Sequence, residues 1–176
     1  MIDKERILEA KRVLEAEGNA IFSTANKLDL NFSKCVDLII NCKGKIVISG
    51  IGKSGNIGRK ITSTLASLGT PSIFLHTSDA FHGDLGILRK DDLLILISNS
   101  GETDELQKLL NYAKINGNKS IAITGNINSS ISKKANYCLD ASVESEACTL
   151  NLAPTCSTSV TMALGDALAI ICLLYT

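Results

Sequence analysis

Few aromatic residues, an even charge balance and no apolar leader are the first features of this sequence. Phe, Trp and Tyr make up 4% of its 176 residues, so aliphatic side chains must fill the core. Lys and Arg number 18, as do Asp and Glu, which argues against a nucleic acid partner. Charged residues from Asp3 to Arg6 replace the apolar stretch of a secretory signal. We also expect no membrane-spanning segment and no membrane partner.

Paired cysteine motifs are missing as well. The six cysteines are scattered, and no two of them have C-x-x-C spacing. In a chain of this length, such a distribution indicates reduced thiols and a cytoplasmic location instead of a disulfide framework. They are Cys35, Cys42, Cys138, Cys148, Cys156 and Cys172.

Strand patterns alternate with helix patterns along most of the chain. This alternation predicts an α/β fold, a three-layer α/β/α sandwich with a five-stranded parallel sheet, in one domain over residues 1–176. Helices fill 1–44: one up to about Glu17, interrupted at Gly18, another to Leu28, and a third capped by Asn31 or Ser33. The predicted core, residues 45–176, has strands at 45–49, 72–75, 93–97, 120–124 and 137–139, and a last helix starting near Thr155.

A glycine-rich turn follows the first strand. Gly50-Ile51-Gly52-Lys53-Ser54-Gly55 fits G-x-G-x-x-G and directly precedes a helix, a position that attracts anions. A dinucleotide site would need an acidic residue at the end of the second strand, but Asp79 comes too late. A nucleotide P-loop would need glycine in place of Val47. We therefore expect a phosphate-bearing ligand near Lys53, with a purely structural turn as the alternative.

A hydroxyl-rich loop follows the third strand. Residues 98–103 offer three hydroxyls at a helix N-terminus, where hydroxyls and backbone N–H groups can bind a phosphate. Loops at the carboxyl ends of neighbouring parallel strands meet in one crevice. A third hydroxyl-rich segment, 155–159, either joins this rim or simply caps the last helix.

Proton-transfer groups are the remaining requirement for a reaction. His82 is expected in a glycine-rich loop after the second strand, which favours a ligand or catalytic role. Glu102 and Glu105 fall in the first turn of a helix, where carboxylates also stabilise the helix dipole. The full set of candidates is Lys53, His82, Glu102, Glu105, Glu144 and Glu146.

Several motifs together resemble a known family. From about residue 35 to the end, the chain is similar to the sugar isomerase (SIS) domain of the arabinose 5-phosphate isomerases, a flavodoxin-like fold. The similar motifs are Gly50 to Gly55, Ser67-Leu68-Gly69-Thr70-Pro71-Ser72, Ala80-Phe81-His82-Gly83-Asp84-Leu85-Gly86, Ser98 to Glu105, Glu146-Ala147-Cys148, Leu152-Ala153-Pro154-Thr155 and Gly165-Asp166-Ala167-Leu168.

This resemblance implies interconversion of D-ribulose 5-phosphate and D-arabinose 5-phosphate, which leads to Kdo for lipopolysaccharide or capsule. It implies a homotetramer with active sites between subunits, no cofactor, and possible inhibitory zinc at His76. The implied catalytic residues are Lys53, His82, Glu105 and Glu146. The implied substrate-binding residues are Ser54, Gly69, Thr70, His82, Ser98, Asn99, Ser100 and Thr103.

The implied reaction is a proton transfer. A base removes a proton from C2 of the open-chain aldose and returns it at C1 through a cis-enediol. One carboxylate suffices if its pKa is raised, and we assign this role to Glu146, with Glu105 as the alternative. Lys53 or His82 would stabilise the enediolate oxygens.

The chain also departs from the family pattern. The family's histidine-proline-glycine-glycine segment and its CBS regulatory domains are absent from these 176 residues, which fits either a truncated domain or a short form. Alternatives to the isomerase are a non-catalytic phosphosugar-binding sensor, another aldose–ketose phosphosugar isomerase, and a Rossmann-type dehydrogenase.

Overall fold

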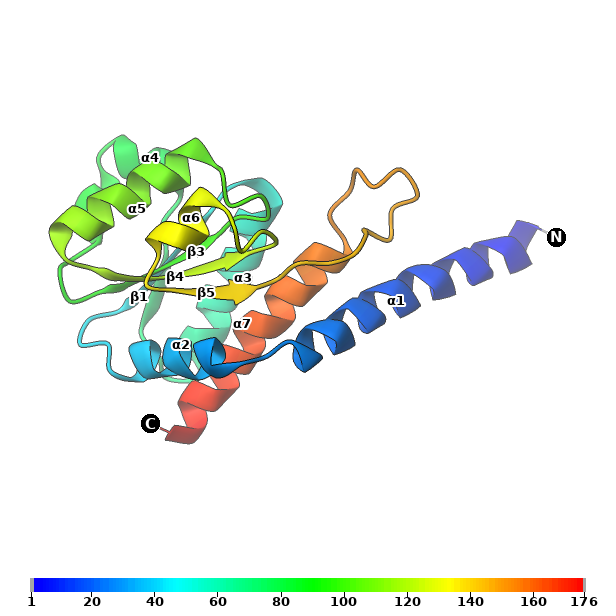
Figure 1. Ribbon diagram of the computed structural model, residues 1–176, viewed down its shortest axis with the longest axis horizontal. Coiled ribbons are helices and arrows are strands. Elements are labelled where there is room, and N and C mark those ends of the chain that lie inside the picture. The colour runs from blue at the N-terminus through cyan, green and yellow to red at the C-terminus, as the bar shows by residue number, and fades with distance from the viewer. Residues whose placement is uncertain (1, 176) are drawn as a thin grey trace.

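Five short strands form one parallel sheet. The computed structural model describes residues 2–175 and gives the strand order β2-β1-β3-β4-β5, so the order reverses between β1 and β3 (Figure 1). All four neighbouring pairs are parallel. The strands are β1 (Ile46–Gly50), β2 (Ser72–Phe74), β3 (Leu93–Ile97), β4 (Lys119–Thr124) and β5 (Tyr137–Asp140).

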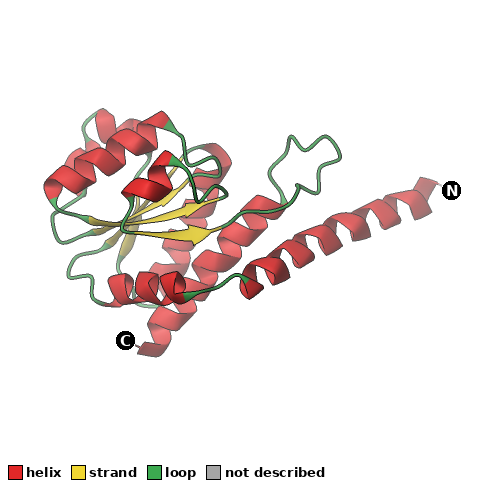
Figure 2. Cartoon of the chain, viewed as in Figure 1, coloured by secondary structure: helices red, strands yellow, loops and turns green. Residues whose placement is uncertain are grey.

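Helices cover both faces of this sheet (Figure 2). Side chains alternate along each strand, so Ile95 in β3 faces one layer of helices while Leu94 and Leu96 face the other. The first layer contains α2 (Leu30–Ile40), α3 (Gly52–Ser67) and α7 (Cys156–Tyr175). The second contains α4 (Thr77–Phe81), α5 (Asp104–Asn116) and α6 (Ser130–Lys134), with a short 3₁₀ helix, η1 (Asp84–Ile87). The predicted sandwich with a five-stranded parallel sheet is confirmed.

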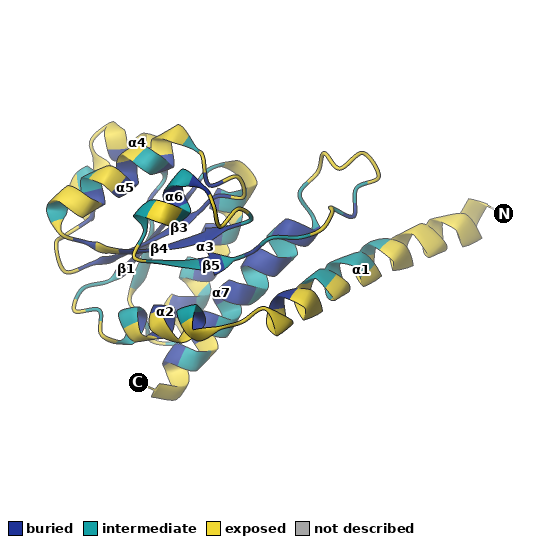
Figure 3. Cartoon of the chain, viewed as in Figure 1, coloured by how far each residue is buried: buried dark blue, intermediate teal, exposed yellow. Residues whose placement is uncertain are grey.

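The central strands are the most deeply buried part of the chain, dark blue in Figure 3. Every residue of β1 and β3 is buried. Strands enclosed on both faces need continuous apolar runs, which explains the aliphatic sequence of β3.

One helix is more apolar than expected. By length and composition α7 could cross a membrane. The expectation that no apolar stretch is long enough to span one is therefore corrected. However, 44% of its apolar window is buried, and a core helix of a soluble protein meets the same criterion. Its Gly165 lies so close to α3 that a Cβ there would meet Ile61 at 2.4 Å. The apolar composition of α7 therefore matches its packing in the core.

The N-terminal helices differ from the expected boundaries. α1 (Ile2–Asn26) is continuous through Gly18, so the predicted interruption is wrong. An internal glycine costs about 1 kcal/mol relative to alanine, which a long helix packed against α7 tolerates. α2 is capped by Asp29, not by Asn31 or Ser33, and ends at Ile40 with Asn41 as its C-cap, before Gly44.

A partly buried ion pair joins the starts of two central strands. The Asp92 side chain is 2% exposed and accepts hydrogen bonds from the Lys45 ammonium (2.6 Å), the Lys45 N–H (2.9 Å) and the Arg89 N–H (2.8 Å). Burial raises the pKa of Asp92, but the bonds from Lys45 and Arg89 outweigh burial and hold the pKa below 3.8. The carboxylate therefore stabilises the fold in its ionised form.

Replacing this carboxylate is expected to destabilise the fold. Asp92→Asn removes the charge that binds Lys45, and we expect a loss of about 2 to 4 kcal/mol in the free energy of unfolding, measured by urea denaturation at pH 7. Because the folded pKa lies below the ordinary value, the stabilisation is present above pH 3.8 and is lost as the pH falls through the folded pKa. The exposed neighbour provides the control, Asp91→Asn. Equal unfolding free energies for wild type and Asp92→Asn at pH 7 would contradict this account.

Candidate functional site

A small cavity lies beyond the carboxyl ends of β1, β3 and β4, beside the point where the strand order reverses. Helix α3 begins directly after β1, and the loop 98–103 connects β3 to α5. Among the predicted residues, Lys53, Ser54 and Asn99 line this cavity. Ser157 and Thr158, from the first turn of α7, line it as well. In an open parallel sheet, such a crevice at the switch point is the usual place for a ligand.

The loop 98–103 folds onto its own hydroxyl groups. The hydroxyls of Ser98 and Thr103 lie 2.9 Å apart, and the Gly101 N–H donates to Ser98 Oγ at 3.0 Å. The Glu102 N–H donates to Ser100 Oγ at 3.2 Å. Gly101 has a φ of +67°, which favours glycine. These bonds hold a compact, hydroxyl-rich turn at the start of α5.

The helix N-terminus behind this turn is suited to an anion. Thr103 is the N-cap residue of α5, but its side chain does not cap the helix. Its hydroxyl pairs instead with Ser98, across the loop. Since N–H groups at a helix start attract negative charge, this arrangement leaves the end of α5 suited to a phosphate.

Glu146 binds the start of α7. Its Oε2 accepts from the Thr155 N–H (2.7 Å), the Thr155 hydroxyl (3.1 Å) and the Ser157 N–H (3.2 Å), and its Oε1 accepts from the Ser157 hydroxyl. Ser157 also lines the cavity with Lys53. The Glu146 carboxylate therefore contacts a residue of the cavity wall. The segment 155–159 thus contributes Ser157 and Thr158 to the rim, and the N–H groups at the start of α7 are capped by Glu146.

The pKa of Glu146 moves in the opposite direction to our expectation. Burial raises the pKa, but the hydrogen bonds from Ser157 and Thr155 outweigh burial and leave it below 4.5. A single carboxylate that shuttles the proton was expected to have a raised pKa. The physical reason for the difference is that four donors at a helix N-terminus stabilise the ionised form.

The other glutamates at this edge differ from Glu146. Glu102 accepts from the Ser130 N–H at 2.8 Å, and its pKa is lowered by its hydrogen bonds with Ser130, so it caps α6. Glu105 is exposed in the first turn of α5. Glu144 is exposed in the irregular segment that follows β5.

Both histidines follow β2 at the carboxyl edge of the sheet. His76 precedes α4, and its ring lies 6.4 Å from that of Phe74. His82 lies after β2 in the turn between α4 and η1, as the C-cap residue of α4, and is exposed. Within residues 2–175, no three His, Cys, Asp or Glu side chains are grouped so as to hold a metal ion.

Gly69 and Thr70 lie apart from this crevice. They precede β2 and line a separate cavity with Gly44, Pro71 and Cys172 at the amino ends of the strands. Within one chain, the structure therefore does not bring these two predicted residues together with Lys53 or Asn99.

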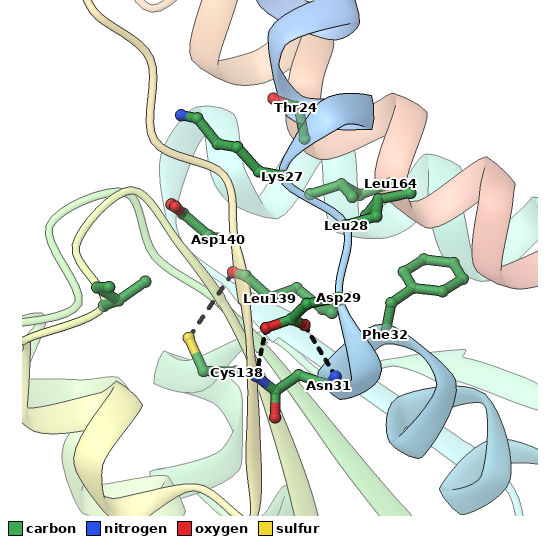
Figure 4. Close-up of a pocket in the computed structure, with 11 residues that line it drawn as sticks. Thr24, Lys27, Leu28, Asp29, Asn31, Phe32, Cys138, Leu139, Asp140 and Leu164 are labelled. Atoms are coloured by element: carbon green, nitrogen blue, oxygen red, sulfur yellow. Dashed lines mark hydrogen bonds between the residues drawn. The ribbon is translucent and has the colours of Figure 1, made fainter.

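A further cavity lies where α1 and α2 meet β5 (Figure 4). Its two carboxylates form local hydrogen bonds, while the Lys27 ammonium donates to the carbonyl and hydroxyl oxygens of Ser142 at 3.3 Å. Asp29 accepts from the Asn31 N–H (2.8 Å) and side-chain amide (3.0 Å), and Asp140 accepts from the Ser142 N–H at 2.8 Å. Asp29 and Asp140 thus stabilise the turns at which they lie.

Asn99 was among the predicted binding residues, whereas Ser157 and Thr158 were considered only as part of the segment 155–159. Their clustering in a hydroxyl-rich stretch before an apolar helix was the available signal. These two residues line the same cavity as Lys53 because α7 packs across it. That position depends on the contacts of α7 with α1, α2 and α3, which are distant in the sequence.

Comparison with known proteins agrees with this architecture. A family model described as the SIS domain matches residues 38–171. The chain is 51% identical to arabinose 5-phosphate isomerase KpsF of Escherichia coli, over 96% of this chain and 54% of KpsF. It is 49% identical to arabinose 5-phosphate isomerase KdsD of Pseudomonas aeruginosa, over 93% of this chain and 50% of KdsD. The chain thus spans about half the length of these curated relatives.

A solved structure covers nearly the whole chain. The c3406 protein of E. coli CFT073, in complex with arabinose 5-phosphate, is 39% identical and superposes with a TM-score of 0.95 over 99% of this chain and 93% of that one. Together with the family match over residues 38–171, this similarity confirms the resemblance found in the motifs. The chain belongs to the SIS domain family.

Proposed function

We propose that this chain is the isomerase domain of a D-arabinose 5-phosphate isomerase, which interconverts D-arabinose 5-phosphate and D-ribulose 5-phosphate. The observation that carries the proposal is its likeness to KpsF, KdsD and a structure solved with arabinose 5-phosphate. The crevice lined by Lys53 and Asn99 supports it, because an ammonium group and a side-chain amide there can bind sugar oxygens.

In this proposal the phosphate binds the loop 98–103. Ser98, Ser100 and Thr103 supply hydroxyls, and the start of α5 supplies N–H groups and a favourable dipole. The sugar then extends toward Ser54, Asn99 and Lys53. The ammonium group of Lys53 would stabilise the enediolate oxygens, with His82 as the other candidate for this role. No cofactor is required for this route, and zinc at His76 would act as an inhibitor.

Glu146 is the proposed base, with Glu105 as the alternative. Hydrogen bonds from α7 keep Glu146 ionised at neutral pH and fix the direction of its oxygens. A fixed orientation favours proton transfer because the acceptor need not reorganise during the reaction. The lowered pKa makes the carboxylate a weaker base, so positioning must contribute much of the rate.

We further propose that the protein is cytoplasmic and that its product feeds Kdo synthesis for lipopolysaccharide or capsule. The scattered cysteines support the location, since no disulfide joins any of the six within residues 2–175. The family resemblance and the KpsF and KdsD relatives support the pathway.

Self-association as a homotetramer is also part of the proposal. The outer half of α1 extends away from the rest of the chain in Figures 1 and 3, with much of its surface exposed. Ile7 (57% exposed), Leu14 (71%) and Ile21 (36%) recur every seven residues, so they share one face of the helix. An apolar stripe with this spacing fits a helix from a second copy of the chain.

The test of the activity is a coupled assay on D-arabinose 5-phosphate beside glucose, fructose and ribose phosphates. In it, we expect Glu146→Gln to lower kcat by about 10²- to 10⁴-fold, because the amide cannot accept the C2 proton. Substrate binding, measured by calorimetry, should persist. Glu15→Gln, on an exposed part of α1, is the control.

Full activity in Glu146→Gln together with an inactive Glu105→Gln would transfer the base role to Glu105. Phosphosugar binding by the wild type without turnover would favour the sensor.

The stripe on α1 is tested by charge. Leu14→Glu should reduce the molar mass measured by light scattering, because a buried carboxylate would destabilise helix pairing. The control is Leu30→Glu, since Leu30 is 78% exposed and lies on α2, away from the stripe. An unchanged assembly in Leu14→Glu would show that this face of α1 is not the interface.

A further inference from the structure

One charged residue of α1 contacts the segment that carries Glu146, and a second contacts the start of α7. A guanidinium nitrogen of Arg12 donates to the backbone carbonyl of Ala147 at 2.6 Å. One and a half turns further along α1, Glu17 accepts from the Ser159 hydroxyl at 2.6 Å. Both contacts are partly buried and join parts of the chain more than 130 residues apart in the sequence.

These two contacts hold the two parts of the chain that fix Glu146, namely its own segment and the first turn of α7. Ala147 directly follows Glu146, and its N–H donates to the Thr155 hydroxyl at 2.9 Å. Ser159 lies in the first turn of α7, which supplies the Ser157 N–H and hydroxyl to Glu146. Arg12 therefore holds the chain beside the carboxylate, and Glu17 holds the helix that binds it.

The segment between β5 and α7 depends on such contacts. Residues 141–155 contain no helix or strand, so no regular ladder of backbone hydrogen bonds fixes Glu146. Segments of this kind open at low free-energy cost unless side chains hold them. Arg12 is itself oriented, because Glu9 on the same helix accepts two bonds from its guanidinium, at 2.7 and 2.9 Å.

We propose that Arg12 and Glu17 are positioning residues for the reaction, which act by holding Glu146 and the start of α7 in the geometry needed for proton transfer. This inference rests on the proposed function for its catalytic consequence. It gives α1 a role beyond covering the core, because a helix outside the sheet controls the orientation of the base.

The kinetic test uses the full chain and D-arabinose 5-phosphate. Arg12→Ala and Glu17→Ala should each lower kcat on the order of 10- to 100-fold with little change in KM, because a small displacement of a base affects the transition state more than binding. Arg12→Lys and Glu17→Gln retain a donor and an acceptor, respectively, and should restore much of the rate. Arg6→Ala is the matched control, since Arg6 pairs only with the exposed Asp3 among the ion pairs found in residues 2–175.

A double-mutant cycle separates positioning from general loss of structure. If Arg12 acts through Glu146, Arg12→Ala should have little further effect on the residual rate of Glu146→Gln. An equal fold loss in both backgrounds, or an unchanged kcat in both alanine variants, would overturn the inference.

Amide hydrogen exchange tests the same inference without turnover. The Thr155 and Ser157 amides, which donate to Glu146, should exchange at least several-fold faster in Arg12→Ala and Glu17→Ala than in Arg6→Ala. Unchanged exchange at both amides would overturn the inference even if the wild type proved inactive. A wild type without isomerase activity but with the expected exchange pattern would instead refute the proposed function alone.

Discussion

Because its neighbouring strands run parallel, the chain must cross a face of the sheet after each strand, and every strand ends at the same edge. The ends of β1 and β3 are adjacent, and the order reverses between them. The glycine turn at Lys53 and the hydroxyl loop at Ser98 are therefore neighbours, although 45 residues separate them in the sequence. The location of the crevice follows from this one constraint on the sheet.

The start of α7 adds the third wall of the crevice. Its first turn contributes Ser157 to the cavity and at the same time binds Glu146 through backbone and hydroxyl donors. This use of a helix N-terminus gives an ionised and oriented carboxylate, with less basicity than an apolar pocket would give. Proton transfer by Glu146 therefore depends on the orientation of its carboxylate. The contacts of α1 with Ala147 and Ser159 support this orientation.

Local sequence patterns predicted much of the fold. The aliphatic run Leu93–Ile97 was predicted with the bounds it has in the structure, because a strand buried on both faces leaves an unambiguous apolar signal. Gly18 was misjudged because a local propensity of about 1 kcal/mol does not interrupt a helix with tertiary support. Asp29 was missed because three neighbouring polar residues could each cap α2.

The site was less predictable than the fold. The structure brings Lys53, Ser54 and Asn99 to one crevice, as parallel strands that end at the same edge of the sheet require. The lowered pKa of Glu146 and the separation of Gly69 and Thr70 from the crevice depend on three-dimensional contacts that no local pattern encodes.

The most direct measurement of the central claim is turnover of D-arabinose 5-phosphate in D₂O, followed by NMR. Proton transfer through an enediol predicts that D-ribulose 5-phosphate forms and that solvent deuterium appears at its C1. Binding of the sugar phosphate with neither ketose formation nor deuterium incorporation would contradict the account.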